Sequence, residues 1–113
     1  MPRTTIAVTD VTRAGVLRPA GTAADVANGN QCDNDGRVFL SCNNTNGSTQ
    51  TVTIVTPGTV DTLAVADRVV TLLTTEVKLI GPFPPTQYNA GNVLQFDATH
   101  AGVLIAPIRV PPQ

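Results

Sequence analysis

Apolar and polar positions alternate along much of this chain. Between residues 50 and 56, Val52 and Ile54 are expected to point one way while Thr51, Thr53 and Val55 point the other, the period of a half-buried β-strand. No segment carries an apolar stripe at helical period. The same alternation, rich in β-branched residues, recurs in segments 4–9, 15–19, 37–42, 60–66, 68–73, 77–80, 92–97 and 103–110.

Turn residues separate these segments. Asn46-Gly47, at the tip of the polar segment 43–48, predicts a β-hairpin. Residues 21–36 are rich in Asn, Asp and Gly, so they are expected to form the longest loop, with one helical turn at its start. Turn signals about ten residues apart predict an all-β fold, a compact antiparallel β-sandwich, jelly-roll- or Ig-like, of about seven or eight short strands.

The length of 113 residues fits one domain with one core. We expect residues 1–18 to form an extended N-terminal arm with the first strand or strands, and residues 19–113 to form a single β-sandwich domain. Both the arm and the proline-rich C-terminal segment 106–112 are expected to reach neighbouring molecules.

The composition is unusually poor in charge. Charged residues make up 13% of the chain and the net charge is −1, against about 25% charged residues in average proteins. This gives no electrostatic basis for binding nucleic acid or an anionic membrane. Low charge protects a free chain poorly against self-association, which favours a protein packed against others, although a threonine-rich soluble domain remains the alternative.

Targeting signals and cysteines bear on the compartment. The N-terminus has no apolar signal segment, and no stretch approaches the ~20 apolar residues of a membrane helix, so synthesis in a cytoplasm is expected. Cys32 and Cys42 are too few for a zinc site and are expected to be free thiols. A disulfide between them is the alternative if the chain matures outside the cell.

Candidate catalytic groups are scarce. His100 is the only histidine and Glu76 the only glutamate, and both fall in expected turns. The segment Asp33-Asn34-Asp35-Gly36 begins like a calcium loop but runs directly into a strand, so a turn is the favoured interpretation. We therefore predict a protein that is not an enzyme and that uses no cofactor or metal.

Several segments, taken in order, resemble a family of small phage virion structural proteins. They are Asn-Asp-Gly-Arg-Val-Phe-Leu at 34–40, the strand and turn at 51–61, Leu-Ala-Val-Ala-Asp-Arg at 63–68, Lys-Leu-Ile-Gly-Pro-Phe-Pro-Pro at 78–85, and Tyr88-Asn89. The chain departs from the pattern at its cysteine pair, at 74–76 and at Thr62, where glycine is common. The resemblance implies a capsid decoration (cement) protein located in the virion. Such a protein is made in the bacterial cytoplasm and binds the outer surface of the shell.

The resemblance also implies partners: the major capsid protein and further copies of the chain, as a homotrimer. Arg3, Arg13 and Arg18 are candidates for contacts with an acidic capsid surface, although solvated arginines are the alternative. Phe83 and Tyr88, at the proline-rich close of the strand region, are candidates for a contact with a neighbour.

Two other functions stay open. One is a head–tail connector or tail protein, which copy number in the particle would separate from a decoration protein. The other is a carbohydrate- or host-surface-binding β-sandwich. Such modules present exposed Trp or Tyr for stacking on sugars, and this chain has only Tyr88 and no Trp.

Overall fold

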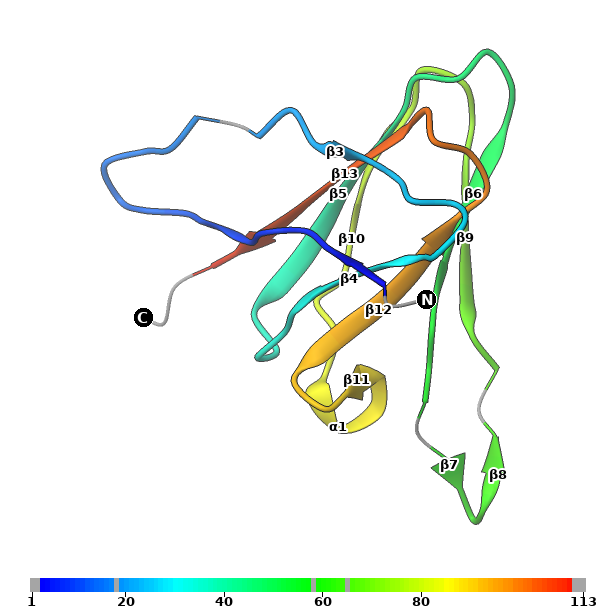
Figure 1. Ribbon diagram of the computed structural model, residues 1–113. Helices are drawn as coiled ribbons and strands as arrows, with labels where there is room; N and C mark the ends of the chain where they lie inside the picture. Colours follow the sequence, from blue (N-terminus) through cyan, green and yellow to red (C-terminus); the bar gives the residue numbers. More distant parts are fainter. Residues whose placement is uncertain (1–2, 18, 58, 65, 111–113) are drawn as a thin grey trace.

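A computed structural model describes residues 3–17, 19–57, 59–64 and 66–110. The predicted all-β sandwich is confirmed: two packed sheets enclose one core (Figure 1). The strands are shorter and more numerous than predicted. No helix of the described residues is long and apolar enough to span a membrane.

The first sheet has the strand order β1-β4-β12-β6-β9, and the second has the order β10-β5-β13-β2. In the first sheet these are β1 (Thr4–Thr5), β4 (Asn30–Asp33), β12 (Val93–Ala98), β6 (Gln50–Ile54) and β9 (Arg68–Leu72), with β11 (Asn89–Ala90) beside β12. In the second they are β10 (Val77–Ile80), β5 (Val38–Asn44), β13 (Val103–Arg109) and β2 (Thr9–Asp10), with β3 (Thr22–Ala23) also beside β13. Pairing is antiparallel except at β1–β4 and β2–β13, which are parallel. A separate hairpin joins β7 (Thr59–Val60) to β8 (Leu63–Ala64), and α1 spans Pro85–Tyr88.

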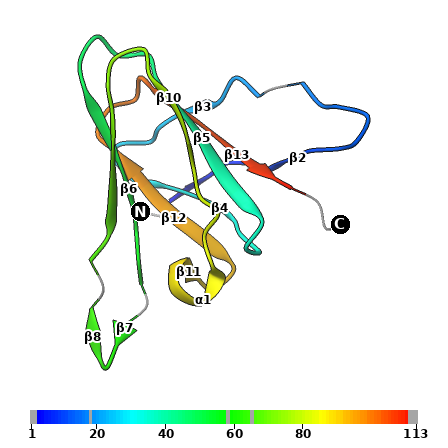
Figure 2. The same ribbon diagram turned by 180° about the vertical axis from the view of Figure 1, so that it is seen from behind.

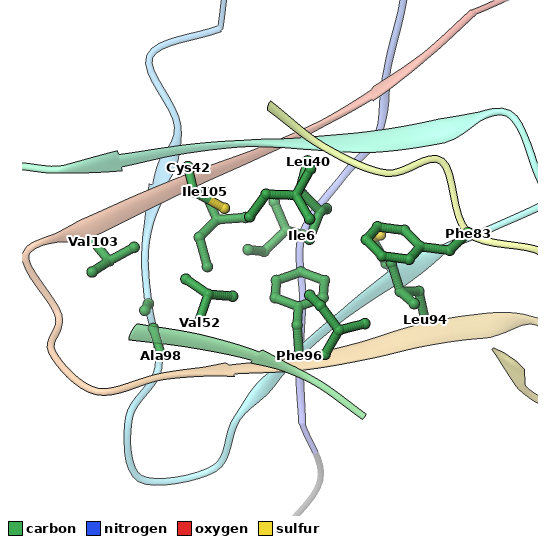
Figure 3. Packing of buried hydrophobic residues seen from close by; sticks show 14 of the residues in the cluster. Ile6, Leu40, Cys42, Val52, Phe83, Leu94, Phe96, Ala98, Val103 and Ile105 are labelled. Carbon is green, nitrogen blue, oxygen red and sulfur yellow. The ribbon is translucent and has the colours of Figure 1, made fainter. Parts of the chain in front are cut away.

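The core is built from alternate residues of both sheets, as the period-two pattern predicts. Val52 and Ile54 of β6 are fully buried, and so are Val38 and Leu40 of β5. Figure 3 shows side chains from the two sheets meeting around Phe96. Because the alternation repeats on each main strand, one apolar layer fills the space between the sheets.

The segment predicted as the longest loop contains β4, the strand between β1 and β12 in the first sheet. Asn30 and Cys32 point inward and are fully buried, while Gln31 and Asp33 are more exposed. The inward asparagine concealed the alternation. Its side-chain oxygen accepts a hydrogen bond from the Asp25 amide at 2.9 Å, which satisfies the buried polar group.

Segment 43–48 is not the tip of a hairpin, because β5 and β6 belong to different sheets. Residues 45–49, 73–76 and 99–102 instead connect one sheet to the other. Buried Asn44 donates from Nδ2 to the carbonyls of Ser48 and Leu72, each at 3.0 Å. The Thr74 hydroxyl donates a hydrogen bond to the Asn46 carbonyl, and the two oxygens are 2.5 Å apart. Polar bonds between these crossing connections therefore hold that end of the sandwich together.

The prediction of a single strand at 60–66 is also wrong. Asp61 and Thr62 have φ values of 53° and 62°, so the chain reverses there and forms the β7–β8 hairpin. Positive φ at both central residues matches the twist of the flanking strands. Val65, within the predicted strand, lies outside the described residues.

The N-terminal residues 3–10 and the C-terminal residues 103–109 both contribute strands to the sandwich. β1 joins the first sheet and β2 the second, with Ile6 buried between them. Residues 12–17 then make a wide excursion away from the body (Figures 1 and 2). Residues 106–109 are not an arm, because they belong to β13, which has paired neighbours on both sides. Pro111 and Pro112 lie outside the described residues.

Candidate functional site

The most distinctive surface lies where β9 and β10 run at the edges of their sheets. Among the described residues β9 pairs only with β6, and β10 pairs only with β5. The two strands lie next to each other, since the Lys78 ammonium donates to the Thr71 carbonyl at 2.8 Å. We call residues 68–80, which contain both strands, the open edge.

The open edge borders a groove of about 710 Å³. Its lining comes from Arg68, Val70, residues 77–84, Gln87 and Tyr88, and we call it the edge groove. Among the described residues, two with cationic side chains, Arg68 and Lys78, and none with a carboxylate line it. Lys78 lies 3.5 Å from the Glu76 carboxylate, outside the lining, so part of its charge is already neutralised.

The wall formed by residues 81–88 is held firmly. Phe83 is 3% exposed and packs edge-to-face on Tyr88, with ring centroids 5.1 Å apart. The Asn34 amide donates to the Phe83 carbonyl at 3.0 Å and to Asn89 Oδ1 at 2.7 Å. Gly81 has a φ of +124°, and a Cβ there would lie 3.0 Å from the Phe83 ring. The groove is therefore preformed on this side.

The predicted contact residues Phe83 and Tyr88 thus differ. Phe83 belongs to the core and supports the groove from beneath, so it offers almost no surface to a neighbour. Tyr88 is half-buried and lines the groove. The contact surface predicted at the proline-rich segment stays a prediction, and it now concerns the edge groove that this segment borders.

Large apolar side chains are exposed along the open edge. Leu79 is 70% exposed and Val69 is 59% exposed, and Leu73 and Val77 are also open to solvent. Scattered exposed apolar residues are ordinary, but a group of them on one edge indicates an interaction surface. Since an unpaired edge also presents free backbone donors and acceptors, this edge is suited to contact another chain.

The β7–β8 hairpin extends from β6 and β9 away from the body (Figures 1 and 2). Its tip carries Asp61, which is exposed, and Leu63, which is 69% exposed. The hydrogen bond from the Thr56 amide to the Asp67 carboxylate, 2.8 Å long, joins the two legs at its base. The hairpin is therefore a projecting ribbon whose tip carries the negative charge of Asp61 and the exposed apolar side chain of Leu63.

A second projecting part is the excursion at residues 12–17 (Figures 1 and 2). Leu17 is 91% exposed and Val16 is half exposed, and Arg13 is exposed beside them. Within the part of the chain that the structure describes, Arg13 makes no ion pair. Arg18, predicted as a capsid contact, lies outside the described residues.

Arg3, the third candidate arginine, makes contacts within the chain. Its guanidinium lies 2.7 Å from the Asp97 carboxylate and donates to the carbonyls of Asn30 and Phe96 at 3.2 and 3.3 Å. Gly29 lies beneath this ion pair, and a Cβ there would collide with both charged groups. Arg3 therefore fastens the N-terminal segment to the first sheet.

The groups considered for chemistry are engaged in structure. Cys32 and Cys42 are free thiols, so the disulfide alternative is not found, and burial raises the pKa of each to about 12. His100 Nδ1 accepts from the Gly102 amide at 2.8 Å in an exposed turn. Asn34 Oδ1 accepts from the Gly36 amide at 3.0 Å, as in a polar turn. Across the described ranges no three His, Cys, Asp or Glu side chains gather as a metal site.

Tyr88 and the proline-rich segment were predicted from the sequence as part of a contact surface. Arg68, Leu79 and the β7–β8 hairpin were not. The signal for the hairpin was Asp61-Thr62 flanked by β-branched residues, a pair that accepts positive φ less readily than Asn-Gly. Nothing in the sequence indicated that β9 and β10 would lie side by side. Comparisons with family models, with curated proteins and with solved structures found no match to this chain.

Proposed function

We propose that this chain is a non-catalytic capsid decoration protein, which binds the outer surface of a phage shell and associates with copies of itself as a homotrimer. The observation that carries the proposal is the distribution of exposed apolar side chains. Among the described residues, six of the nine large exposed apolar side chains lie on two separate parts of the molecule: Val16 and Leu17 on the excursion at 12–17, and Val69, Leu73, Val77 and Leu79 on the open edge.

Two such surfaces suit a subunit that is covered on two sides. Burying one leucine or valine side chain contributes about 1.5–3 kcal/mol, so covering Leu17 and Leu79 would stabilise two different contacts. The low charge of the chain lowers the electrostatic cost of packing against a protein surface. We assign the excursion, with Arg13, to the shell and the open edge to a sister copy.

The direct test is binding to shells purified from the phage that encodes the chain after the protein has been removed. Wild-type protein is expected to sediment with the shells to a fixed ratio. Leu17→Asp should bind far less, while Val26→Asp, at an exposed apolar residue outside both surfaces, should bind like the wild type. Absence of saturable binding, or of the protein from purified particles, would contradict the proposal.

Copy number separates this function from that of a head–tail connector. A decoration protein scales with the number of capsid subunits, whereas a connector is limited to the single vertex that carries the tail. Quantitative mass spectrometry of purified particles, with the major capsid protein as internal standard, gives the ratio. A ratio limited to one vertex would exclude decoration and favour the connector.

A further inference from the structure

We propose that the β7–β8 hairpin of one copy docks in the edge groove of a second copy. The occupant is a defined segment of this same chain, residues 59–64, and the receiving surface is the groove bordered by β9, β10 and residues 81–88. This contact joins two copies of the chain, and it does not depend on whether those copies also bind a capsid.

Charge complementarity supports this pairing. Arg68 and Lys78 line the groove, and no described Asp or Glu joins them in its lining. Asp61 is the only charged residue between positions 59 and 64. Within the described part of the chain, neither Arg68 nor Asp61 has an ion-pair partner. A carboxylate placed beside Arg68 would therefore pair two groups that are exposed and unpaired in the single copy.

Apolar surface is complementary as well. Leu63 projects from the hairpin and is 69% exposed. Apolar residues line the groove, with Val77 and Leu79 of β10 on one side and half-buried Tyr88 on the other. An apolar centre with charges at its border is the usual arrangement of a specific protein interface.

The hairpin of a copy does not reach its own groove. β6 and β9 pair from Gln50↔Leu72 to Ile54↔Arg68, and β7 and β8 pair again beyond them. The ribbon therefore continues outward along the strands, as both views show (Figures 1 and 2). Because Arg68 begins β9 near the base of the ribbon, the tip points away from the groove to which Arg68 belongs. A second copy has to supply the occupant.

This contact is head-to-tail, since each copy gives a hairpin and receives another. Head-to-tail contacts form a closed ring when the rotation between copies closes, and a filament when it does not. A single short hairpin buries less than the ~800 Å² per partner of a standard interface. Closure, which gives every copy two such contacts, is therefore what makes the assembly stable. A homotrimeric ring would satisfy this requirement.

Cross-linking between different chains tests the contact. Leu63→Cys and Gln87→Cys are prepared separately, both at exposed positions, and then mixed under mild oxidation. The native thiols are buried and protonated, so they do not compete. A disulfide joining the two variants is expected in the mixture. The matched control, Leu17→Cys mixed with Gln87→Cys, places an exposed thiol on the opposite projection and should give no such product.

A charge exchange tests the same contact without a cross-link. Asp61→Arg should weaken association by about tenfold or more in sedimentation equilibrium. Combining Asp61→Arg with Arg68→Asp should restore most of that loss. Both positions are exposed, so thermal unfolding verifies that each variant folds. Equal cross-linking in the control, a wild type that stays monomeric at every concentration, or no recovery in the double variant would overturn the proposal.

Discussion

The two sides of the sandwich differ in how the gap between the sheets is closed at the edge strands. On the side bounded by residues 3–10, which we call the closed edge, β1 and β2 pair with one sheet each and Ile6 fills the space between the sheets. On the other side, β9 and β10 end their sheets with no covering strand among the described residues. The first side is closed by one continuous segment that packs Ile6 between the sheets, whereas the edge groove borders β9 and β10 on the second side.

This difference indicates what the open edge is for. Proteins usually protect an edge strand by covering it or by placing charges along it. At the closed edge the chain uses both means, a covering segment and the Arg3–Asp97 ion pair. At the open edge Lys78 is flanked by exposed Val77 and Leu79. Since a segment closes the gap between the sheets on one side only, the open side is where the proposed contact with a second copy would supply cover.

Truncating the buried residue of the closed edge should have the largest effect. Ile6→Ala is expected to lower the free energy of unfolding by about 2–4 kcal/mol, because it removes buried methyl groups and leaves a cavity between the sheets. Leu79→Ala at the open edge should cost less than about 0.5 kcal/mol in the monomer. Urea unfolding at low protein concentration measures both. Equal losses would show that the two edges do not differ in this way.

Breaking the ion pair of the closed edge should have a smaller effect. Arg3→Ala is expected to cost about 1–2 kcal/mol, since one guanidinium serves the Asp97 carboxylate and two carbonyls. Its side chain is 22% exposed, which limits solvent screening.

Arg37→Ala is the matched control for this ion pair. Its partner is Asp35, at 2.9 Å, and both side chains are about 40% exposed, so the loss should stay below about 0.5 kcal/mol. A double-mutant cycle with Asp97→Ala isolates the Arg3–Asp97 contribution. A coupling energy near zero would contradict the assigned role of Arg3.

The sequence predicted those parts of the fold in which one strand pattern was sufficient. Alternation identified β6, β9 and β10 within about two residues, because each strand has one buried face. It missed β4, where buried Asn30 stands in a core position, and it joined β7 and β8 into one strand. Local pattern also could not show that Asn46-Gly47 lies on a crossing between sheets, because strand pairing depends on distant residues.

The candidate site was less predictable for the same reason. Tyr88 was identified from its place beside a proline-rich segment, but the groove exists only because two edge strands from different sheets lie together. Arg3 was expected at the surface, and its partner Asp97 is distant in sequence. Contacts of this kind are properties of the assembled fold and leave no local signal.

Acid should weaken the closed edge through Asp25. Hydrogen bonds from the Thr4 hydroxyl, at 2.5 Å, and from Asn28 lower the pKa of this carboxyl from its ordinary value of 3.8. The folded state therefore holds its proton less tightly than the unfolded state. This contribution to stability is present above pH 3.8 and is lost as the pH falls through the folded pKa.

Thr4→Val removes the hydroxyl that makes the largest contribution to this shift. The pKa of Asp25, followed by NMR, should rise toward 3.8, while Thr4→Ser, which keeps the hydroxyl, should leave it lowered. The pKa of Asp35, lowered mainly by Arg37, should stay unchanged in both variants and serves as an internal reference. An unchanged Asp25 titration in Thr4→Val would contradict the anchoring of β1 by this bond.

The rate at which each buried thiol is labelled measures local opening at the nearer edge, and it requires only a small change to the chain. Cys42 lies on β5 opposite Lys78 of β10, next to the open edge, while Cys32 lies on β4 beside β1 at the closed edge. With the pKa of each near 12, labelling requires local opening that exposes the thiol. In single-thiol variants, Cys42→Ala and Cys32→Ala, we expect Cys42 to be labelled faster, because the edge groove borders β10, whereas residues 3–10 pack Ile6 between the sheets at the closed edge. Raising the protein concentration should slow the labelling of Cys42 and leave that of Cys32 unchanged, since a second copy would cover only the open edge. Equal rates at all concentrations would mean that the two edges open alike and that no copy protects either one.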